Sequence, residues 1–154
     1  MVGLNQQLKP ALHAACLAYL QQRIDAAQSA MLAAQESANS ETKSSAGDKY
    51  ETGRAMAHEE RNRNAVQLRE ALNLKAELER IDPEKACDTV RPGALVTTSM
   101  GRFYLSISAG KLTVDGADYF AVSPAAPVAA ALSGKRVGEE AVFNGKKVRV
   151  EGIV

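Results

Sequence analysis

The sequence predicts an α+β protein, with a long N-terminal antiparallel helical hairpin over residues 1–83 and a small β-rich domain over residues 84–154. Composition predicts this division. The first part of the 154-residue chain is rich in Ala, Gln, Glu, Leu and Arg, which favour helices. After Pro83 the chain is rich in Val, Thr, Gly and aromatic residues, which favour strands and tight turns.

The predicted hairpin rests on two runs of apolar and small residues spaced three and four apart, as a coiled-coil seam requires. The runs are Leu17, Leu20, Ile24, Ala27, Met31, Ala34 and Ala38, then Ala65, Leu68, Leu72, Leu74, Leu78 and Ile81. We expect helices over about residues 4–38 and 46–81, with Ser45 and Asp48 forming a capping box between them. Alanines replace leucines toward the connection, which favours a slender two-helix rod.

The predicted β-rich domain is punctuated by turn signals. Its elements are strands over residues 94–98, 103–108, 111–114, 119–122, 142–143 and 147–150, and a short helix over residues 125–132. Asp115-Gly116 and Asn144-Gly145 predict two tight hairpin turns. Ser123 as the cap and Pro124 as a first-turn proline are expected to open the helix, and Gly134 to close it.

Charge and cysteine content exclude several classes of function. Lys and Arg total 19 against 18 Asp and Glu, so bulk positive charge cannot hold a nucleic acid. Two cysteines are too few for a disulfide scaffold or a four-ligand zinc site; we expect Cys16 to be a small core residue and Cys87 to lie in the linker. The chain has no apolar run of about 18 residues and no secretory signal pattern, so we expect a cytoplasmic location.

No catalytic constellation is evident, since neither histidine lies beside a plausible nucleophile with an orienting acid. We therefore expect no enzyme activity of the chain's own. The hairpin tip is the candidate functional site, because acidic and basic side chains alternate there. Its candidate residues are Glu41, Asp48, Lys49, Tyr50, Glu51 and Arg54. Carboxylates are ligands that Mg²⁺ prefers, although a polar tip can also be charged simply because it faces water.

The second part of the chain carries a further pattern. It consists of Val122-Ser123-Pro124, Ala131-Leu132, Gly134-Lys135 and Gly138-Glu139, followed by the closing strand pair. Behind a long helical hairpin, this pattern resembles the bacterial Gre-type transcript cleavage factors, which act in transcription elongation. The pattern covers about half of the C-terminal domain, and the hairpin is similar in architecture. The resemblance implies an FKBP-like C-terminal fold, a monomer when free, and RNA polymerase core as the partner.

The resemblance also implies roles for particular residues. The C-terminal domain would dock at the rim of the polymerase secondary channel through Ser123, Pro124, Gly134, Lys135 and Arg136. The hairpin would then reach the polymerase active centre, close to the RNA 3′ end. There Asp48 and Glu41 would help to hold a Mg²⁺ ion shared with the polymerase, which itself cleaves backtracked RNA. The factor would have no intrinsic cofactor.

One departure from the family pattern keeps alternatives open. Gre hairpins carry two acids three residues apart and then a tyrosine; in the frame set by Tyr50 those acid positions are Lys43 and Ala46. The chain could therefore occupy the channel without stimulating cleavage. Two other classes are an FKBP-like peptidyl-prolyl isomerase, which needs an aromatic-lined pocket, and a scaffold hairpin. In a scaffold, the basic docking face would comprise Lys135, Arg136, Lys146, Lys147 and Arg149.

Overall fold

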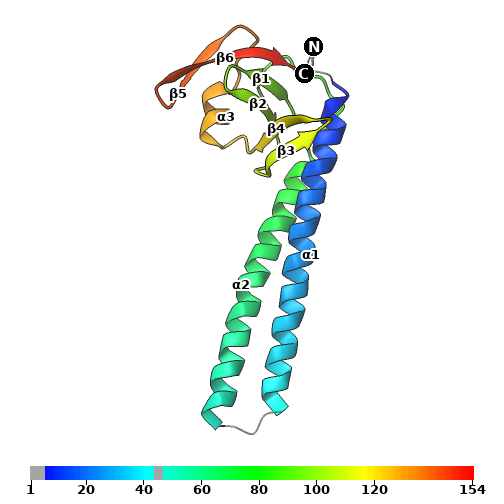
Figure 1. The fold of residues 1–154 in the computed structure, drawn as a ribbon, viewed down its shortest axis with the longest axis vertical. Coiled ribbons are helices and arrows are strands. Elements are labelled where there is room, and N and C mark those ends of the chain that lie inside the picture. Colours follow the sequence, from blue (N-terminus) through cyan, green and yellow to red (C-terminus); the bar gives the residue numbers. More distant parts are fainter. Residues whose placement is uncertain (1–5, 44–46) are drawn as a thin grey trace. The chain divides into compact units, whose positions relative to one another are not determined.

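The computed structural model describes residues 6–43 and 47–154, and the side chains of all of these except residues 40–51. Two long helices packed together precede a six-stranded sheet, which confirms the α+β class (Figure 1). The chain forms two compact units. The hairpin unit is Leu20–Lys75, and the sheet unit combines Met1–Tyr19 with Ala76–Val154. Both helices therefore begin or end within the sheet unit.

Helix α1 spans Leu8–Lys43 and helix α2 spans Gly47–Glu79. The predicted start of α1 near residue 4 is wrong because Pro10 lacks an N–H and its ring clashes with the carbonyl four residues earlier, so it is tolerated only in the first turn. The predicted end near residue 38 is also wrong. Each further residue adds a backbone hydrogen bond, which is enough to continue the helix through polar residues. The predicted capping box lies outside the described residues.

Buried positions along the helices follow a seam that differs from the predicted one in detail. On α1 these positions are Lys9, Leu12, Cys16, Leu20, Ile24, Ala27, Ala34 and Ala38. Predicted Leu17 is instead 39% exposed, and Cys16 takes its place. On α2 predicted Leu72 is 46% exposed, while its neighbour Ala71 is fully buried. The helical period buries one residue of each pair, and in both pairs it is the smaller one; the sulfur of Cys16 lies 3.6 Å from Ser106 Oγ.

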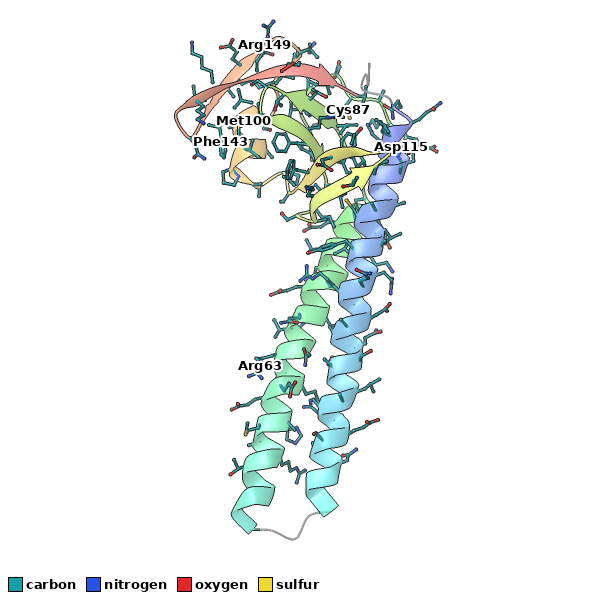
Figure 2. The ribbon with its side chains drawn as sticks, viewed as in Figure 1. Arg63, Cys87, Met100, Asp115, Phe143 and Arg149 are labelled. Carbon is teal, nitrogen blue, oxygen red and sulfur yellow. The ribbon has the colours of Figure 1, made fainter. Side chains whose placement is uncertain are left out.

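The hairpin unit is held by small side chains and a polar contact. Ala57 and Ala71 of α2 are buried, as are Ala27, Ala34 and Ala38 of α1. Arg61 Nη1 donates a hydrogen bond of 3.1 Å to Gln35 Oε1 across the two helices. Arg63, two residues along α2, points away from α1 into solvent (Figure 2). Small seam residues allow close helix approach but bury little apolar area per turn.

The sheet has the strand order β3-β4-β2-β1-β6-β5, so β3 and β5 are its edges (Figure 1). The strands are β1 (Leu95–Thr98), β2 (Gly101–Leu105), β3 (Gly110–Val114), β4 (Ala117–Val122), β5 (Glu140–Phe143) and β6 (Lys146–Ile153). Strands β2 and β4 pair in parallel, and all other neighbours pair antiparallel. The two predicted hairpin turns are confirmed: φ is positive at Asp115, Gly116, Asn144 and Gly145, as a two-residue type I′ turn requires.

Helix α3 spans Pro127–Leu132, so its predicted opening at Ser123-Pro124 is wrong. Pro127 explains the difference. In a helix capped by Ser123, the nitrogen of Pro127 would have to donate the first helical hydrogen bond, and it has no hydrogen. Ser123 Oγ instead accepts a bond of 3.2 Å from the Ala125 amide in a preceding turn. Gly134 follows the helix with a φ of +77°, which confirms its predicted closing position.

Strand β2 is the centre of the sheet unit because both of its faces are covered. Phe103 and Leu105 join the apolar cluster that includes Ala129 and Leu132 of α3. Tyr104 points to the opposite face, as strand alternation requires, and is fully buried there beside His13 of α1. The first turns of α1 and the helix α3 therefore cover opposite faces of the same sheet.

Candidate functional site

The predicted tip residues belong to the ends of the two helices. Glu41 lies in the last turn of α1, and Asp48 to Glu51 lie in the first turn of α2, so residues 44–46 alone connect the helices. The side chains of Glu41, Asp48, Lys49, Tyr50 and Glu51 lie outside the described residues, while Arg54 is described and exposed. Acidic residues in a first helical turn are stabilised by the positive end of the helix dipole.

The structure does not test a metal site at the tip. Across the side chains it describes, no three or more His, Cys, Asp or Glu residues gather in a way that could hold a metal ion. The tip carboxylates fall outside that search. A Mg²⁺ role for Asp48 and Glu41 thus stays a prediction. Among the described helices, none has both the length and the apolar character needed to cross a membrane.

The loop between α3 and β5 carries three of the predicted docking residues. The Gly134 amide donates to the Val90 carbonyl (2.8 Å), and the Val90 amide donates to the Lys135 carbonyl (2.9 Å). The Arg136 amide donates to Glu139 Oε1 (2.9 Å) and thereby closes the next turn. These bonds hold the backbone, so that the half-buried Lys135 and the exposed Arg136 are presented from a fixed loop.

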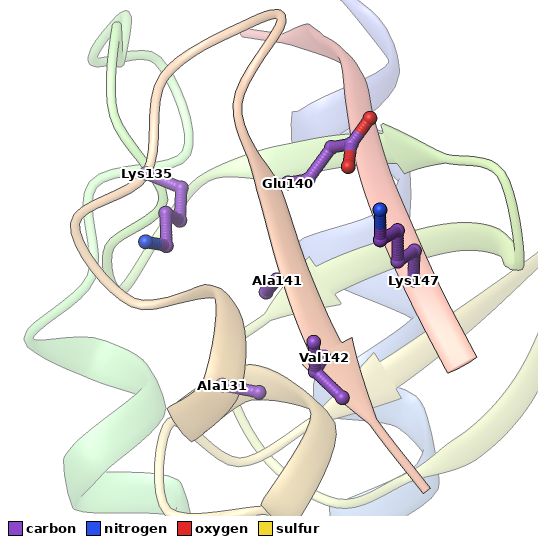
Figure 3. A pocket seen from close by; sticks show the side chains of 6 residues that line it. All are labelled: Ala131, Lys135, Glu140, Ala141, Val142 and Lys147. Atoms are coloured by element: carbon purple, nitrogen blue, oxygen red, sulfur yellow. The ribbon is translucent and has the colours of Figure 1, made fainter. Parts of the chain in front are cut away.

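A shallow groove of about 440 Å³ lies beside this loop, and we call it the β5 groove. Its lining residues are Ala131, Lys135, Glu140, Ala141, Val142 and Lys147 (Figure 3). Lys135 and Lys147 lie on opposite sides of β5, and the carboxylate of Glu140 lies on the same side as Lys147 (Figure 3). Val142 is 67% exposed on the same strand. The groove thus combines an exposed apolar side chain with two ammonium groups and one carboxylate.

Strand β5 also presents free backbone groups along this groove. The Val150 amide donates to the Glu139 carbonyl (2.9 Å), which fixes the hydrogen-bonded pairs of the antiparallel β5–β6 ladder. Because such pairs alternate along a ladder, the N–H and C=O groups of Glu140 and Val142 point outward from the sheet edge. An extended peptide can pair with an edge of this kind.

The predicted docking residues do not all line one cavity. Ser123 and Pro124 line a separate cavity of about 390 Å³, whose wall also includes Arg80 and Pro92. Sequence reasoning missed Glu140 and Val142 as part of the β5 groove. The alternation of these two residues with Ala141 could have predicted a strand here. Only the strand order, however, shows that β5 is an edge strand of the sheet.

A second polar cluster lies where the first turns of α1 meet the sheet. His13 Nδ1 and the Tyr104 hydroxyl share a hydrogen bond of 2.9 Å. Burial lowers the pKa of His13 and raises the pKa of Tyr104, since both charged forms are disfavoured there. Cys16 is buried as predicted, its Sγ is 3.6 Å from Ser106 Oγ, and burial raises its pKa. A neutral imidazole, a phenol and a thiol are structural partners rather than an activated nucleophile.

No family model matches the chain, and no curated protein matches it either.

Proposed function

We propose that this protein is a regulator that binds RNA polymerase core and inserts its helical hairpin into the secondary channel. The observation that carries the proposal is the hairpin itself. Helices of 36 and 33 residues pack along a seam of small side chains, and residues 44–46 alone connect them. Glu41, Asp48 and Glu51 belong to the ends of these two helices in the sequence, which supports their delivery to an active centre in another protein.

The sheet unit is proposed to be the docking module, with an FKBP-like arrangement in which a short helix packs on a mixed sheet. The β5 groove is its docking surface. Lys135 and Lys147 favour an acidic partner segment, and the outward backbone groups of Glu140 and Val142 favour one that is extended. We therefore assign this surface to an extended acidic segment at the rim of the polymerase channel.

At the active centre the proposed role is to modulate cleavage of backtracked RNA. A Mg²⁺ ion bound by the polymerase supplies the Lewis acid for phosphoryl chemistry. Asp48 is the leading candidate to approach that ion, with Glu41 or Glu51 assisting, and Lys49, Tyr50 and Arg54 border it. In this proposal the chain places charged side chains near the ion, and the polymerase catalyses the cleavage reaction.

Binding is tested by pull-down of RNA polymerase core with the purified chain. We expect the wild type to retain the polymerase and the double variant Lys135→Glu, Lys147→Glu to bind about tenfold more weakly or worse, because repulsion replaces attraction. The matched control is Lys111→Glu on the other edge strand, where Lys111 forms only an exposed ion pair with Asp118. Absence of polymerase binding by the wild-type chain overturns the proposal.

The tip is tested on a backtracked elongation complex by the rate of transcript cleavage. We expect Asp48→Asn to change the modulated rate by about 10–100-fold while binding is retained. Glu60→Gln, an exposed change farther along α2, is the matched control. Equal effects of the two variants would contradict the role of Asp48. Binding without any change in cleavage by the wild type would leave a factor that only occupies the channel.

The isomerase alternative has less support from the cavities. Five cavities within residues 6–43 and 47–154, the β5 groove among them, have no aromatic residue in their linings. Tyr104, Tyr119 and Phe103 are buried in the sheet unit instead. A proline-peptide isomerisation assay tests this alternative directly.

A further inference from the structure

Lys9 and Cys87 form a buried pair at the start of α1, within the sheet unit. The Lys9 side chain is 0% exposed although lysine is among the residues least often buried. Its Nζ donates a hydrogen bond of 2.6 Å to the Lys85 carbonyl and lies 3.9 Å from Cys87 Sγ. The pair therefore joins the first turn of α1 to the linker that follows α2.

Cys87 (labelled in Figure 2) borders a cavity and lies near cationic side chains. Cys87 is 9% exposed and lines a cavity of about 390 Å³ together with Lys85 and Arg91. The Arg91 guanidinium interacts with the Cys87 sulfur, an interaction that raises the pKa of Arg91. The thiolate is the form of a cysteine that reacts with peroxides.

The amine of Lys9 is placed to react with an oxidised sulfur. Burial is the main cause of a lowered Lys9 pKa, and the nearby Cys87 opposes this effect in part. A lower pKa increases the fraction of neutral amine, which carries the nucleophilic lone pair. The 3.9 Å separation leaves only a small movement before nitrogen and sulfur are in reach.

We propose that hydrogen peroxide links Lys9 Nζ to Cys87 Sγ covalently through a sulfenamide bond. In the first step the Cys87 thiolate attacks one peroxide oxygen, the O–O bond breaks, and hydroxide leaves and takes up a proton as water. In the second step the Lys9 nitrogen attacks the sulfenic sulfur. The S–O bond breaks and a second water leaves with a proton from nitrogen. One thiol, one amine and one peroxide thus give one S–N bond and two waters; sulfur is oxidised and peroxide reduced.

The link closes a covalent loop from residue 9 to residue 87 that contains nearly all of both long helices. Closing a long loop restricts the unfolded chain and so stabilises the folded one. An external thiol reverses the link by attacking sulfur and releasing the amine. Cys16 is an internal control, because it is fully buried beside Ser106 and its pKa is raised.

The test is mass spectrometry of the full chain after treatment with hydrogen peroxide. We expect the intact mass to fall by two hydrogens, dithiothreitol to restore it, and digestion to yield a peptide pair joined at Lys9 and Cys87. The linked fraction should be about tenfold or more higher in native than in urea-unfolded protein, because the fold supplies the proximity. Cys16→Ser should retain the link.

Cys87→Ser and Lys9→Met should abolish the link, and circular dichroism checks that each variant is folded. In Lys9→Met we expect dimedone to capture the Cys87 sulfenic acid that the amine no longer consumes. The wild-type spectrum decides the proposal even if Lys9→Met fails to fold. The proposal is overturned if Cys87 only gains oxygen, if it does not react, or if the mass loss disappears in Cys16→Ser, which would identify a Cys16–Cys87 disulfide.

Discussion

The hairpin unit and the sheet unit bury their side chains in different ways. In the hairpin unit most buried positions are alanines, such as Ala27, Ala34 and Ala71. In the sheet unit large side chains such as Tyr104 and Leu105 fill both faces of β2. Buried apolar area is the main source of stability. The sheet unit should therefore contribute most of the free energy of folding. The hairpin unit is slender because its buried side chains are small, and for the same reason it should be locally less stable.

This difference matters for the proposed function. A rod that enters a narrow channel needs small seam residues, whereas a docking module needs a fixed surface. The loop bonds around Gly134 and Lys135 provide such a surface in the sheet unit. We expect the hairpin unit to open locally at a lower free energy than the sheet unit.

The largest expected effect tests the sheet side of the comparison. Leu105→Ala removes a side chain that is almost fully buried in β2, and the resulting cavity should lower the free energy of unfolding by about 2–5 kcal/mol. Urea unfolding followed by circular dichroism measures it. Val142→Ala on the exposed face of β5 is the control and should change stability by less than about 0.5 kcal/mol. Similar losses in both variants would show that the core is elsewhere.

A smaller effect tests the hairpin side. Ala34→Leu forces a large side chain into a seam position that is buried and should cost about 1–3 kcal/mol. Hydrogen exchange measures where the cost appears, and we expect faster exchange in Leu20–Lys75 with the sheet strands unchanged. Ala33→Leu, one residue earlier and exposed, is the matched control. Faster exchange throughout the sheet would mean that the two units unfold together.

The smallest effect concerns the polar cluster of the sheet unit. Burial lowers the pKa of His13 below its ordinary value of 6.5, so the unfolded chain binds a proton more readily than the folded one. Stability from neutral His13 is fully present above about pH 6.5 and declines as the pH falls from there toward the lower folded pKa. His13→Gln should flatten this part of the curve of unfolding free energy against pH. A curve unchanged from wild type would contradict the buried, neutral imidazole.

Local signals predicted the turns and the general class well. Asp115-Gly116 and Asn144-Gly145 form the expected hairpins, because only a few residues tolerate positive φ without strain. The seam was less predictable. Cys16 and Leu17 are adjacent in the sequence and both apolar, as are Ala71 and Leu72. Hydrophobicity alone predicted that the larger residue of each pair would be the buried one. Tertiary packing buries the smaller one, and for Cys16 the neighbour is Ser106, which is far away in the sequence.

The candidate site was predictable only in part. The charged tip and the basic loop were visible as residue patterns, and Lys147 belonged to the basic cluster. The β5 groove was not visible, because an edge exists only once the strand order is known. The burial of Lys9 was not predictable either, since its partners at residues 85 and 87 are supplied by the linker that follows α2.

The sequence by itself determined the two long helices, the tight turns and the absence of a disulfide framework, because these depend on neighbours within a few residues. Only the tertiary structure decided which helix face is buried, which strand is an edge and which polar groups pair inside. These features depend on contacts between residues far apart in the chain, such as His13 with Tyr104 and Lys9 with Cys87. The physical reason is that desolvation and hydrogen bonding act on groups that the fold brings together in space. A local sequence pattern does not specify which distant residues come into contact.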